Sequence, residues 1–356
     1  ADTPAAFISA NRGKRSITLS VQHEAGAQAL ARLLTGADVL LTNLRPRALE
    51  KLGLSPKEVG ERFPHLVYCS LTAYGWGGPD QDRPGYDIAA FYGRTGISYE
   101  ITTQGTPPPA LLQGLGDTFT AMSAAAGIAA ALFERASTGR GRFVEASLMR
   151  TGMWALAGEL GQKALGGNPR PPAPREKSRM PLYNSYLTQD GRWFFLVGVE
   201  AQRQLRPVLL AIGRIDLLGD ERFKDARAVA RNSAAFIAIL DTTFATQPLC
   251  YWSDRLDEHD VLWAPIQSPA EVLDDAQAHA SGAWIDIDRG RPGLGAEGGS
   301  EACVKSVDAP LRFDGVSRTV VPGPPAAGEH TQAILAELGL TAGEIEQALQ
   351  EGQRKR

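Results

Sequence analysis

The sequence predicts an α/β protein with a large domain built on a mainly parallel sheet and a smaller α+β domain. In the first half of the chain, strand patterns alternate with helical patterns, which is the order that βαβ units require. A stretch rich in Gly and Pro at 166–181 then breaks the pattern and cannot form a regular element. With 356 residues, the chain is also long enough for two domains.

The first half gives a predicted large domain at 1–165. Short apolar runs alternate there with amphipathic segments. Strands are expected at 17–21, 38–43 and 66–72, and helices at 25–34, 47–52 and 55–63. No GxGxxG sequence follows a strand, so a dinucleotide site is not indicated.

The second half predicts a linker at 166–181, a small α+β domain at 182–287 and a segment at 288–356 that returns to the large domain. Two apolar and aromatic runs flank Gln189-Asp190-Gly191, a pattern typical of a hairpin. Helices are expected at 202–212, 233–244 and 251–259, and a loop at 288–300. Thr341 and Glu344 have the spacing of a capping box, which predicts a last helix from Ala342 towards Gln350.

The composition is that of an ordinary globular protein and excludes several functions. A net charge of −3 argues against nucleic acid as a partner. No apolar run of membrane-spanning length is recognised, so no membrane partner is expected. Cys69, Cys250 and Cys303 form no CxxC pair, and neither they nor the histidines have the spacing of a metal site. We expect no metal and a reducing, cytoplasmic location.

Asp117 is the strongest candidate for a catalytic group. It follows Gly116 and precedes a run at 118–133 made mostly of small and apolar residues, which predicts a tightly packed helix. The helix dipole would favour an ionised carboxylate there. The alternative is structural, because Asp is among the commonest N-cap residues. These residues by themselves leave both roles open.

Motifs along nearly the whole chain resemble those of the family III CoA-transferases. This family contains formyl-CoA and carnitine CoA-transferases and also α-methylacyl-CoA racemases. The motifs occur in the family's order and are NRGKRSITL (11–19), ADVLLTNLRPRALEKLGL (37–54), HLVYCSLTAYGWGGP (65–79), RPGYDIAAF (83–91), GD (116–117), ERASTGRGRFVEASL (134–148) and GEHTQAILAELGL (328–340).

The resemblance implies a Rossmann-like large domain, an interlocked homodimer and the exchange of CoA between an acyl-CoA donor and a carboxylic acid acceptor. CoA would be part of the substrate, with no tightly bound cofactor. Asp117 matches the family's nucleophile, which forms an acyl anhydride and then an aspartyl-CoA thioester. Gly116 would permit close approach of the backbone to the thioester. Ala121 stands where the family usually has glycine, which is a departure.

Tyr86 and Asp87 separate two activities within the resemblance. Racemases carry a histidine acid/base at the position of Tyr86, whereas transferases place a tyrosine there, beside the CoA chain and next to an acidic residue. Tyrosine is a poor acid/base at neutral pH because its ordinary pKa is about 10. The pair therefore favours CoA transfer, with racemisation as the alternative. The structural alternative is a turn, a buried aromatic and a helix cap.

Coenzyme A requires fixed cations for its phosphates and an apolar surface for its adenine. Cationic candidates are Lys14, Arg15, Arg45 and Lys51, and the matched segment adds Asn43, Leu44 and Leu52. Arg47 stands where glycine is common in the family. Each cation could instead be a solvated surface charge, as most are.

The acyl site is less well defined by the sequence. Phe91, Tyr92, Tyr99 and Trp76 could line a pocket for an aryl or branched acid or could simply pack in the core. Relatives carry a strand, a helix lining the acyl site and a second strand ahead of the position of Asn11, and a sheet without them would expose an edge. This leaves a non-catalytic acyl-CoA-binding protein as a further alternative.

Overall fold

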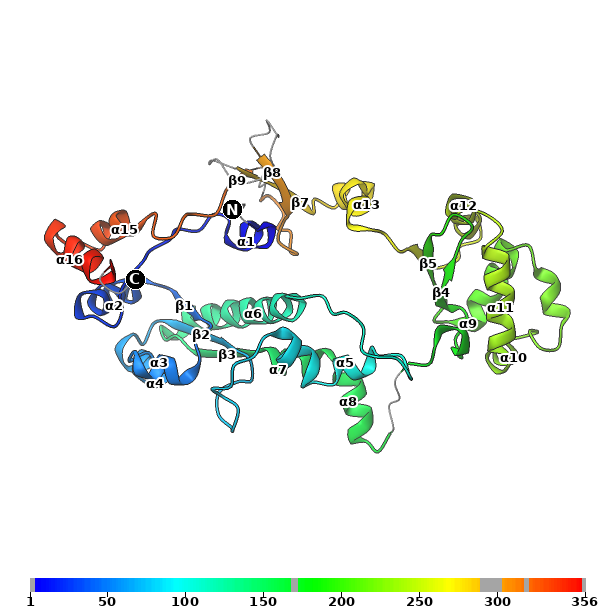
Figure 1. Cartoon of the computed structure of the whole chain (residues 1–356), viewed down its shortest axis with the longest axis horizontal. Coiled ribbons are helices and arrows are strands. Elements are labelled where there is room, and N and C mark those ends of the chain that lie inside the picture. Colours follow the sequence, from blue (N-terminus) through cyan, green and yellow to red (C-terminus); the bar gives the residue numbers. More distant parts are fainter. Residues whose placement is uncertain (1–3, 168–171, 289–302, 317–319, 354–356) are drawn as a thin grey trace. The chain divides into compact units, whose positions relative to one another are not determined.

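The structure is a computed structural model that describes residues 4–167, 172–288, 303–316 and 320–353. The chain forms two compact units, whose elements are labelled in Figure 1. Unit 1 consists of Ala1–Thr95, Leu112–Ala155 and Leu273–Arg356, and unit 2 of Gly96–Leu111 and Leu156–Val272. These boundaries differ from the predicted ones: 96–111 and 156–181 belong to unit 2, and 273–287 belongs to unit 1.

A parallel three-stranded sheet forms the centre of unit 1. Its strands are β1 (Val39–Thr42), β2 (Val67–Thr72) and β3 (Phe143–Ser147), in the order β1-β2-β3. The predicted parallel α/β arrangement is therefore present. β3 was missed because its run, FVEAS, is short and includes a glutamate.

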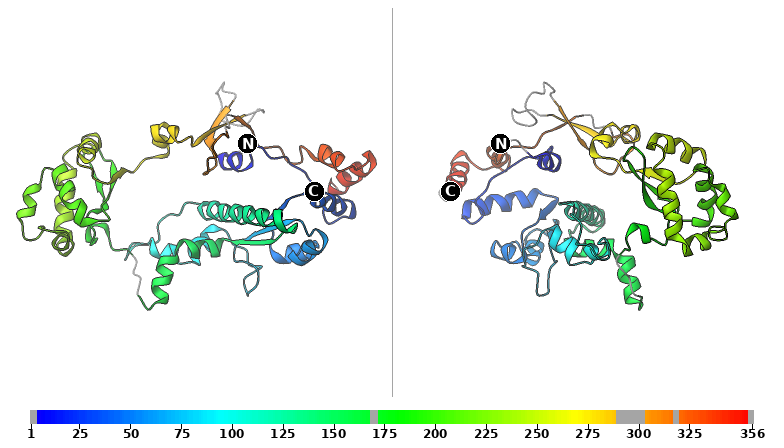
Figure 2. Two further views of the ribbon diagram at one scale, coloured as in Figure 1. Left: turned by 180° about the vertical axis from the view of Figure 1, so that it is seen from behind. Right: turned by 45° about the vertical axis from the view of Figure 1, so that its right-hand side comes forward.

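Helices cover both faces of this sheet, as Figures 1 and 2 show. Tyr68 faces an apolar cluster with α2, α3 and α4, whereas its neighbour Cys69 faces α6. This alternation follows from the strand geometry, in which successive side chains point to opposite faces. The helices are α2 (Glu24–Gly36), α3 (Pro46–Lys51), α4 (Pro56–Arg62) and α6 (Leu115–Thr138), which confirms the four predicted there.

The predicted strand at 17–21 is wrong. Its backbone finds no partner strand; the N–H of Thr18 donates instead to the Thr331 hydroxyl at 3.0 Å, and the N–H of Ser16 to His330 Nδ1 at 3.2 Å. Ile17 and Leu19 still bury apolar surface, in a cluster with α2 and the last two helices. Those helices are α15 (Thr331–Glu337) and α16 (Ala342–Gln353).

The described residues of the segment 288–356 belong to unit 1. Thr341 and Glu344 form the predicted capping interactions at the start of α16. Most of the loop expected at 288–300 lies outside the described residues. A mixed sheet in the order β8-β7-β9 covers α1 through Ile287 and Ile8. Its elements are β7 (Trp284–Asp288), β8 (Cys303–Val307), β9 (Val320–Pro322) and α1 (Ala5–Asn11).

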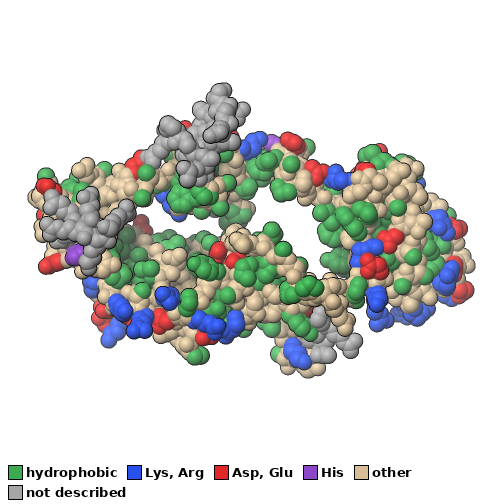
Figure 3. All heavy atoms as spheres, viewed as in Figure 1, with side chains coloured by type: hydrophobic (Ala, Val, Ile, Leu, Met, Phe, Trp, Pro, Cys, Tyr) green, Lys and Arg blue, Asp and Glu red, His purple; other side chains and the backbone are tan. Residues whose placement is uncertain are grey.

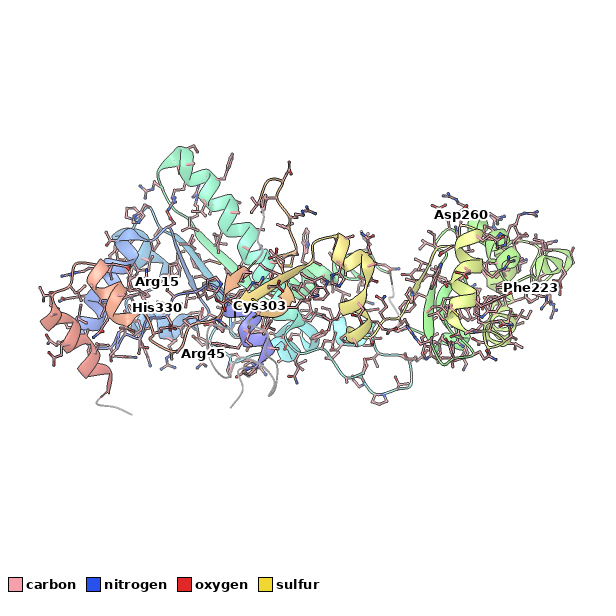
Figure 4. The ribbon with its side chains drawn as sticks, turned by 90° about the horizontal axis from the view of Figure 1, so that it is seen from above. Arg15, Arg45, Phe223, Asp260, Cys303 and His330 are labelled. Atoms are coloured by element: carbon pink, nitrogen blue, oxygen red, sulfur yellow. The ribbon has the colours of Figure 1, made fainter. Side chains whose placement is uncertain are left out.

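Unit 2 is an antiparallel sheet covered by helices. The predicted hairpin is present as β4 (Tyr183–Leu187) and β5 (Trp193–Val197), and β6 (Trp263–Pro265) adds a third strand. Phe223, labelled in Figure 4, belongs to its large apolar core. The three predicted helices appear as α9 (Ala201–Ala211), α11 (Ser233–Phe244) and α12 (Leu249–Glu258).

Several short elements were not predicted. In unit 1 these are η1 (Ile88–Gly93), α7 (Leu148–Ala155) and α14 (Ala276–Ala280), and α13 (Pro269–Asp274) spans the boundary. In unit 2 they are α5 (Ile97–Glu100), α8 (Ala157–Ala164), η2 (Arg175–Lys177), η3 (Ile215–Gly219) and α10 (Ala226–Arg231). The segment expected to be a linker thus contains η2.

Helix α6 corrects one expectation, because it is long and apolar enough to cross a membrane by length and composition. That is a weak indication, since core helices meet the same test. One face of α6 packs on β2 and β3, with Ala124 and Ile128 in the cluster. The opposite face exposes Phe119, Met122 and Phe133, and Figure 3 shows apolar side chains over this helix.

Candidate active site

Asp117 lies in the first turn of α6. The helix begins at Leu115 and its N-cap is Gly114, whose φ of 82° is left-handed and suits glycine. The structural alternative considered for Asp117, an N-cap, is therefore wrong: Asp117 is the third residue of the helix, and no side chain of the helix caps it. The predicted start at 118 was late because the run Gly114-Leu115-Gly116 resembles a loop.

The carboxylate of Asp117 is free. Its side chain is exposed and makes no hydrogen bond or ion pair within the part of the chain that the structure describes. Loss of hydration, and then the negative charge of Asp87, raise the pKa of the Asp117 carboxyl above its usual value. The positive end of the α6 dipole lies beneath the carboxylate and favours its ionised form. Asp117 thus presents an unpaired carboxylate on the first turn of a long helix.

Gly116 allows η1 to pack closely against α6. A Cβ at Gly116 would lie 2.6 Å from Cβ and Cγ of Phe91, closer than any side chain tolerates. The ring of Phe91 also lies against Phe119, with centroids 6.1 Å apart. The Thr120 hydroxyl donates to the Gly116 carbonyl at 2.8 Å. The turn that carries Asp117 therefore rests on the buried ring of Phe91.

Tyr86 and Asp87 are adjacent but lie in opposite environments. The side chain of Tyr86 is 83% exposed, whereas that of Asp87 is 4% exposed. Asp87 Oδ1 accepts a hydrogen bond from the N–H of Ile88 at 2.7 Å, and Oδ2 accepts one from the N–H of Gly114 at 2.5 Å. Asp87 is thus the N-cap of η1, a π-helix, a type often found at functional sites.

The predicted CoA segment forms the loop after β1 and the helix that follows it. Asn43, Leu44 and Arg45 are exposed, and Arg45 donates from Nη1 to the Asp82 carbonyl at 3.1 Å. Lys51 is exposed at the end of α3, while Leu52 packs on the cluster below. Ligands of parallel sheets bind at the carboxyl ends of the strands, which is where this loop lies.

Further cations surround this edge. Arg83 and Arg94 both lie over the Tyr74 ring, 6.0 and 5.3 Å from its centroid, and both pair with Asp80. Sequence reasoning missed them, although the RPGYD motif contains Arg83. Figure 3 shows Lys and Arg side chains over the α3 and α4 part of unit 1.

Lys14 and Arg15 lie elsewhere in unit 1. Arg15 makes a bidentate ion pair with Glu337 of α15 at 2.8 and 2.9 Å, and Lys14 donates to Asn11. Figure 4 shows Arg15 beside His330. The structure therefore brings together Asp87, Gly116 and Asp117 in one group and Asn43 to Leu52 in another. Among the described residues, the side-chain hydrogen bonds of Lys14 and Arg15 go to Asn11 and Glu337 and not to either group.

The aromatic candidates for an acyl pocket serve mainly in packing. Phe91 and Tyr92 are buried, and Trp76 lies edge-on to Phe143 and donates from Nε1 to the Ser70 hydroxyl. Tyr99 is exposed and belongs to unit 2. Across the described ranges, no three His, Cys, Asp or Glu side chains are grouped as a metal site would require.

Comparisons with known proteins place the chain in a family. The family model described as CoA-transferase family III matches residues 1–331. The chain is 30% identical over 331 residues to (R)-2-hydroxy-4-methylpentanoate CoA-transferase of Clostridioides difficile, covering 92% of this chain and 80% of that protein. It is 32% identical over 343 residues to cinnamoyl-CoA:phenyllactate CoA-transferase of Clostridium sporogenes, with coverages of 95% and 80%. A crystal structure of a CaiB/BaiF family protein from Brucella suis superposes with a TM-score of 0.79 at 29% identity, covering 94% and 84%.

Proposed function

Since the chain belongs to CoA-transferase family III and transfers CoA between acids, we propose that Asp117 is the nucleophile of this transfer. The observation that carries the proposal is the free carboxylate of Asp117 on the first turn of α6. Some other exposed carboxylates, such as Asp216 and Glu337, are held by arginine, whereas that of Asp117 is not. An unpaired carboxylate keeps its lone pairs available for attack.

The transfer proceeds through two intermediates on Asp117. A carboxylate oxygen attacks the thioester carbonyl carbon of the donor, the C–S bond breaks, and CoA leaves as the thiolate. The thiolate then attacks Cγ of Asp117 in the mixed anhydride, which releases the donor acid and leaves an aspartyl-CoA thioester. The acceptor carboxylate reverses both steps. Each step exchanges one acyl bond for another, so no other reactant is needed.

Donors for the developing oxyanion are available in the same turn. The first N–H groups of a helix have no partner within it. The N–H of Gly114 is bound by Asp87, which leaves those of Leu115, Gly116 and Asp117 at the start of α6. Fixed backbone donors of this kind stabilise negative charge on oxygen, with no side-chain reorganisation.

The exposed loop after β1 supports a site for CoA there. Arg45 and Lys51 supply cations, Asn43 supplies an amide, and Leu44 is an exposed apolar side chain. Arg15 is a weaker candidate because Glu337 already neutralises it. Tyr86, whose side chain is exposed, is proposed to contact the CoA chain.

We propose a 2-hydroxy acid with an apolar side chain as the acceptor. The two relatives named above act, by their names, on (R)-2-hydroxy-4-methylpentanoate and on phenyllactate, and both are acids of this class. Saturation kinetics with 4-methyl-2-hydroxypentanoate, phenyllactate, glutarate and oxalate would test this. A preference for either dicarboxylic acid would refute it.

A homodimer is proposed as well. The apolar face of α6 continues in exposed side chains of α7, where Trp154 is 82% exposed. Monomeric proteins seldom leave so much apolar surface in contact with water. Light scattering after size exclusion would show a mass twice that of the chain, and a monomer at micromolar concentration would contradict the dimer.

The racemase alternative requires a second acid or base close to Asp117. Tyr86 is exposed, and its neighbour Asp87 has both oxygens occupied by backbone N–H groups. This arrangement supports transfer over racemisation. A non-catalytic acyl-CoA-binding protein would not require a free carboxylate beside unpaired helix N–H groups.

Trapping of the intermediate tests the proposal. The protein is incubated with acetyl-CoA, succinyl-CoA or cinnamoyl-CoA and hydroxylamine, and its intact mass and peptides are measured. We expect a hydroxamate on Asp117 that is absent from Asp117→Ala, whose transfer rate falls by at least about a thousandfold. Asp254→Ala, on the exposed surface of α12, is the matched control and keeps full activity. Transfer without any adduct, or exchange of the α-proton of a 2-methylacyl-CoA, would refute it.

A further inference from the structure

One buried carboxylate joins the starts of two helices. Asp87 accepts hydrogen bonds from Ile88, the first residue of η1, and from Gly114, the N-cap of α6. These N–H donors are 26 positions apart in the chain, since 114 minus 88 is 26. The bond to Gly114 is therefore a tertiary contact, which an ordinary helix cap would not need.

We propose that Asp87 is a positioning residue that anchors the first turn of α6 and so sets the direction of the Asp117 carboxylate. Asp87 acts through Gly114 and does not itself touch the substrate. This inference rests on the proposed function of Asp117. It also gives Asp87 a different role from the direct CoA contact that the resemblance implies.

The burial of Asp87 supports a role that requires its charge. A buried carboxylate without a cationic partner is unfavourable unless hydrogen bonds and dipoles compensate it. Among the described residues, no Arg, Lys or His pairs with Asp87, and two backbone N–H groups at helix starts hold it instead. A cap alone could be formed by a neutral Asn or Ser at far lower desolvation cost.

The retained charge acts on Asp117 in two ways. Two nearby carboxylates repel each other, so Asp117 is directed away from Asp87 and towards solvent, where it is exposed. The same repulsion helps to raise the pKa of the Asp117 carboxyl, which makes the ionised form a stronger base and nucleophile. Gly116, fixed on Phe91, prevents the turn from moving to relieve the repulsion.

Asp87 is the one other carboxyl among the described residues that acts on the charge of Asp117. On η1, Tyr92 donates to the Leu112 carbonyl at 3.3 Å, and loss of hydration and then the charge of Asp87 raise its pKa. Helix α7 packs on both elements and contributes Arg150, which stays charged at all working pH values. Tyr86 is exposed beside Asp87. The acid limb of acylation would therefore report the Asp117 and Asp87 carboxyls, and Asp87→Asn leaves only that of Asp117.

Two variants separate geometry from charge. In Asp87→Asn the amide can accept only one of the two N–H groups and loses the charge. We expect hydroxamate formation at Asp117 to slow by about 100-fold, because small misplacements of a reacting group have effects of that size. The acid limb of its pH profile should also move to lower pH. Asp87→Glu keeps the charge with a longer side chain, so the rate falls and the acid limb does not move to lower pH.

A matched control is Asp225→Asn. Asp225 caps α10 in unit 2 through the N–H of Ala228 at 2.7 Å and lies in the other unit from Asp117. The Asp225→Asn variant should lower the midpoint of thermal unfolding. It should leave the rate of hydroxamate formation and the acid limb of its pH profile unchanged. If Asp87→Asn behaved like Asp225→Asn, Asp87 would be a structural cap and the inference would be overturned, while the adduct on Asp117 would still stand.

Hydrogen exchange tests the anchor without any substrate. In the wild type, a peptide covering 112–118 should contain a protected amide at Gly114, which Asp87→Asn makes at least tenfold faster to exchange. Equal exchange in both proteins would refute the anchor. This measurement stays informative if no donor acylates Asp117. Failure of the proposed anchor can therefore be distinguished from failure of the proposed nucleophile. If the variants do not fold, rapid exchange of Gly114 in the wild type would refute the anchor and slow exchange would support it.

Discussion

Gly116 on α6 and Phe91 on η1 are in contact so close that no side chain fits between them. A Cβ at Gly116 would lie 2.6 Å from two carbons of the Phe91 side chain. The glycine is required by this approach and not by its backbone conformation, since its φ is not left-handed. The close approach of η1 and α6 near Asp117 therefore depends on the lack of a Cβ at Gly116.

The first prediction follows from this contact. Gly116→Ala should force Phe91 and the first turn of α6 apart, lowering the free energy of unfolding by about 1–3 kcal/mol, as overpacking does. Hydroxamate formation at Asp117 should slow at the same time. The matched control is Gly60→Ala on α4, where a Cβ meets no atom within 4 Å and helix propensity should add up to about 1 kcal/mol. Normal acylation in Gly116→Ala would refute the proposed role of this contact.

A second prediction concerns the loop after β1. Arg45→Ala and Lys51→Ala should each raise the Kd for CoA by about tenfold, which corresponds to about 1.4 kcal/mol. The dependence of the Kd on salt should also become weaker. Arg47→Ala removes the same charge from the first turn of α3 and should have a smaller effect, because it is the backbone N–H of Arg47 that donates to Asp82. Equal effects from all three would indicate a diffuse field and no defined phosphate contact.

A third prediction concerns alkaline stability. The buried Tyr68 hydroxyl donates to the Leu54 carbonyl at 2.7 Å, and loss of hydration raises the pKa of Tyr68 to about 12. The unfolded value is about 10, so the stabilisation from this group is complete below about pH 10 and is lost as the pH rises towards about 12. Tyr68→Phe should lower the free energy of unfolding at neutral pH by about 1 kcal/mol and remove this share of the alkaline decline.

Urea unfolding at about pH 8 and about pH 11 would measure the difference. Exposed Tyr251→Phe is the matched control and should leave the decline unchanged. A decline that is equally steep in Tyr68→Phe and the wild type would contradict the assignment.

A fourth prediction concerns unit 2. Arg175 donates to the Ser185 carbonyl at 2.8 Å and to Asp241 at 2.6 Å, and it lies over the rings of Tyr186 and Trp193. Lysine cannot make both hydrogen bonds in one plane, so Arg175→Lys should lower the free energy of unfolding by about 2 kcal/mol. Arg214→Lys, at an exposed pair with Asp216, should change it by less than about 0.5 kcal/mol. Comparable losses of unfolding free energy in the two variants would refute the role of the planar guanidinium group of Arg175.

The parts of the fold that sequence reasoning predicted are those with strong local signals. Ser55 and Glu58 form the capping box that starts α4, and Gly191 turns the predicted hairpin with a φ of 76°. The segment at 17–21 has the composition of a strand, but whether it becomes one depends on a partner strand. The N–H of Thr18 donates to the Thr331 hydroxyl instead, and that of the preceding Ser16 donates to His330; both partners lie more than 300 positions away.

The candidate site could likewise be predicted from the sequence only in part. Asp117 and Gly116 were identifiable from the GD motif and the helix after it. The anchor from Asp87 to Gly114 was not, because the sequence shows only an acidic residue after a Pro-Gly turn and gives no sign of which amide it will bind. Nor could the sequence show that η1 would be a π-helix, since tertiary packing decides the turn width. The contacts with CoA expected at Asn43, Leu44 and Leu52 remain predictions.

The division of the chain into units has a consequence for its synthesis. Unit 2 is formed from two separate stretches inserted into unit 1, and the last stretch of unit 1 follows all of unit 2. Helix α2, made early, buries Ala29 against Leu335 and Ala348 near the carboxyl end. On the ribosome, the apolar face of α2 therefore stays uncovered until the final helices emerge. Closure of such distant contacts is slow. A nascent chain of this protein therefore exposes this apolar face for as long as unit 2 is being translated.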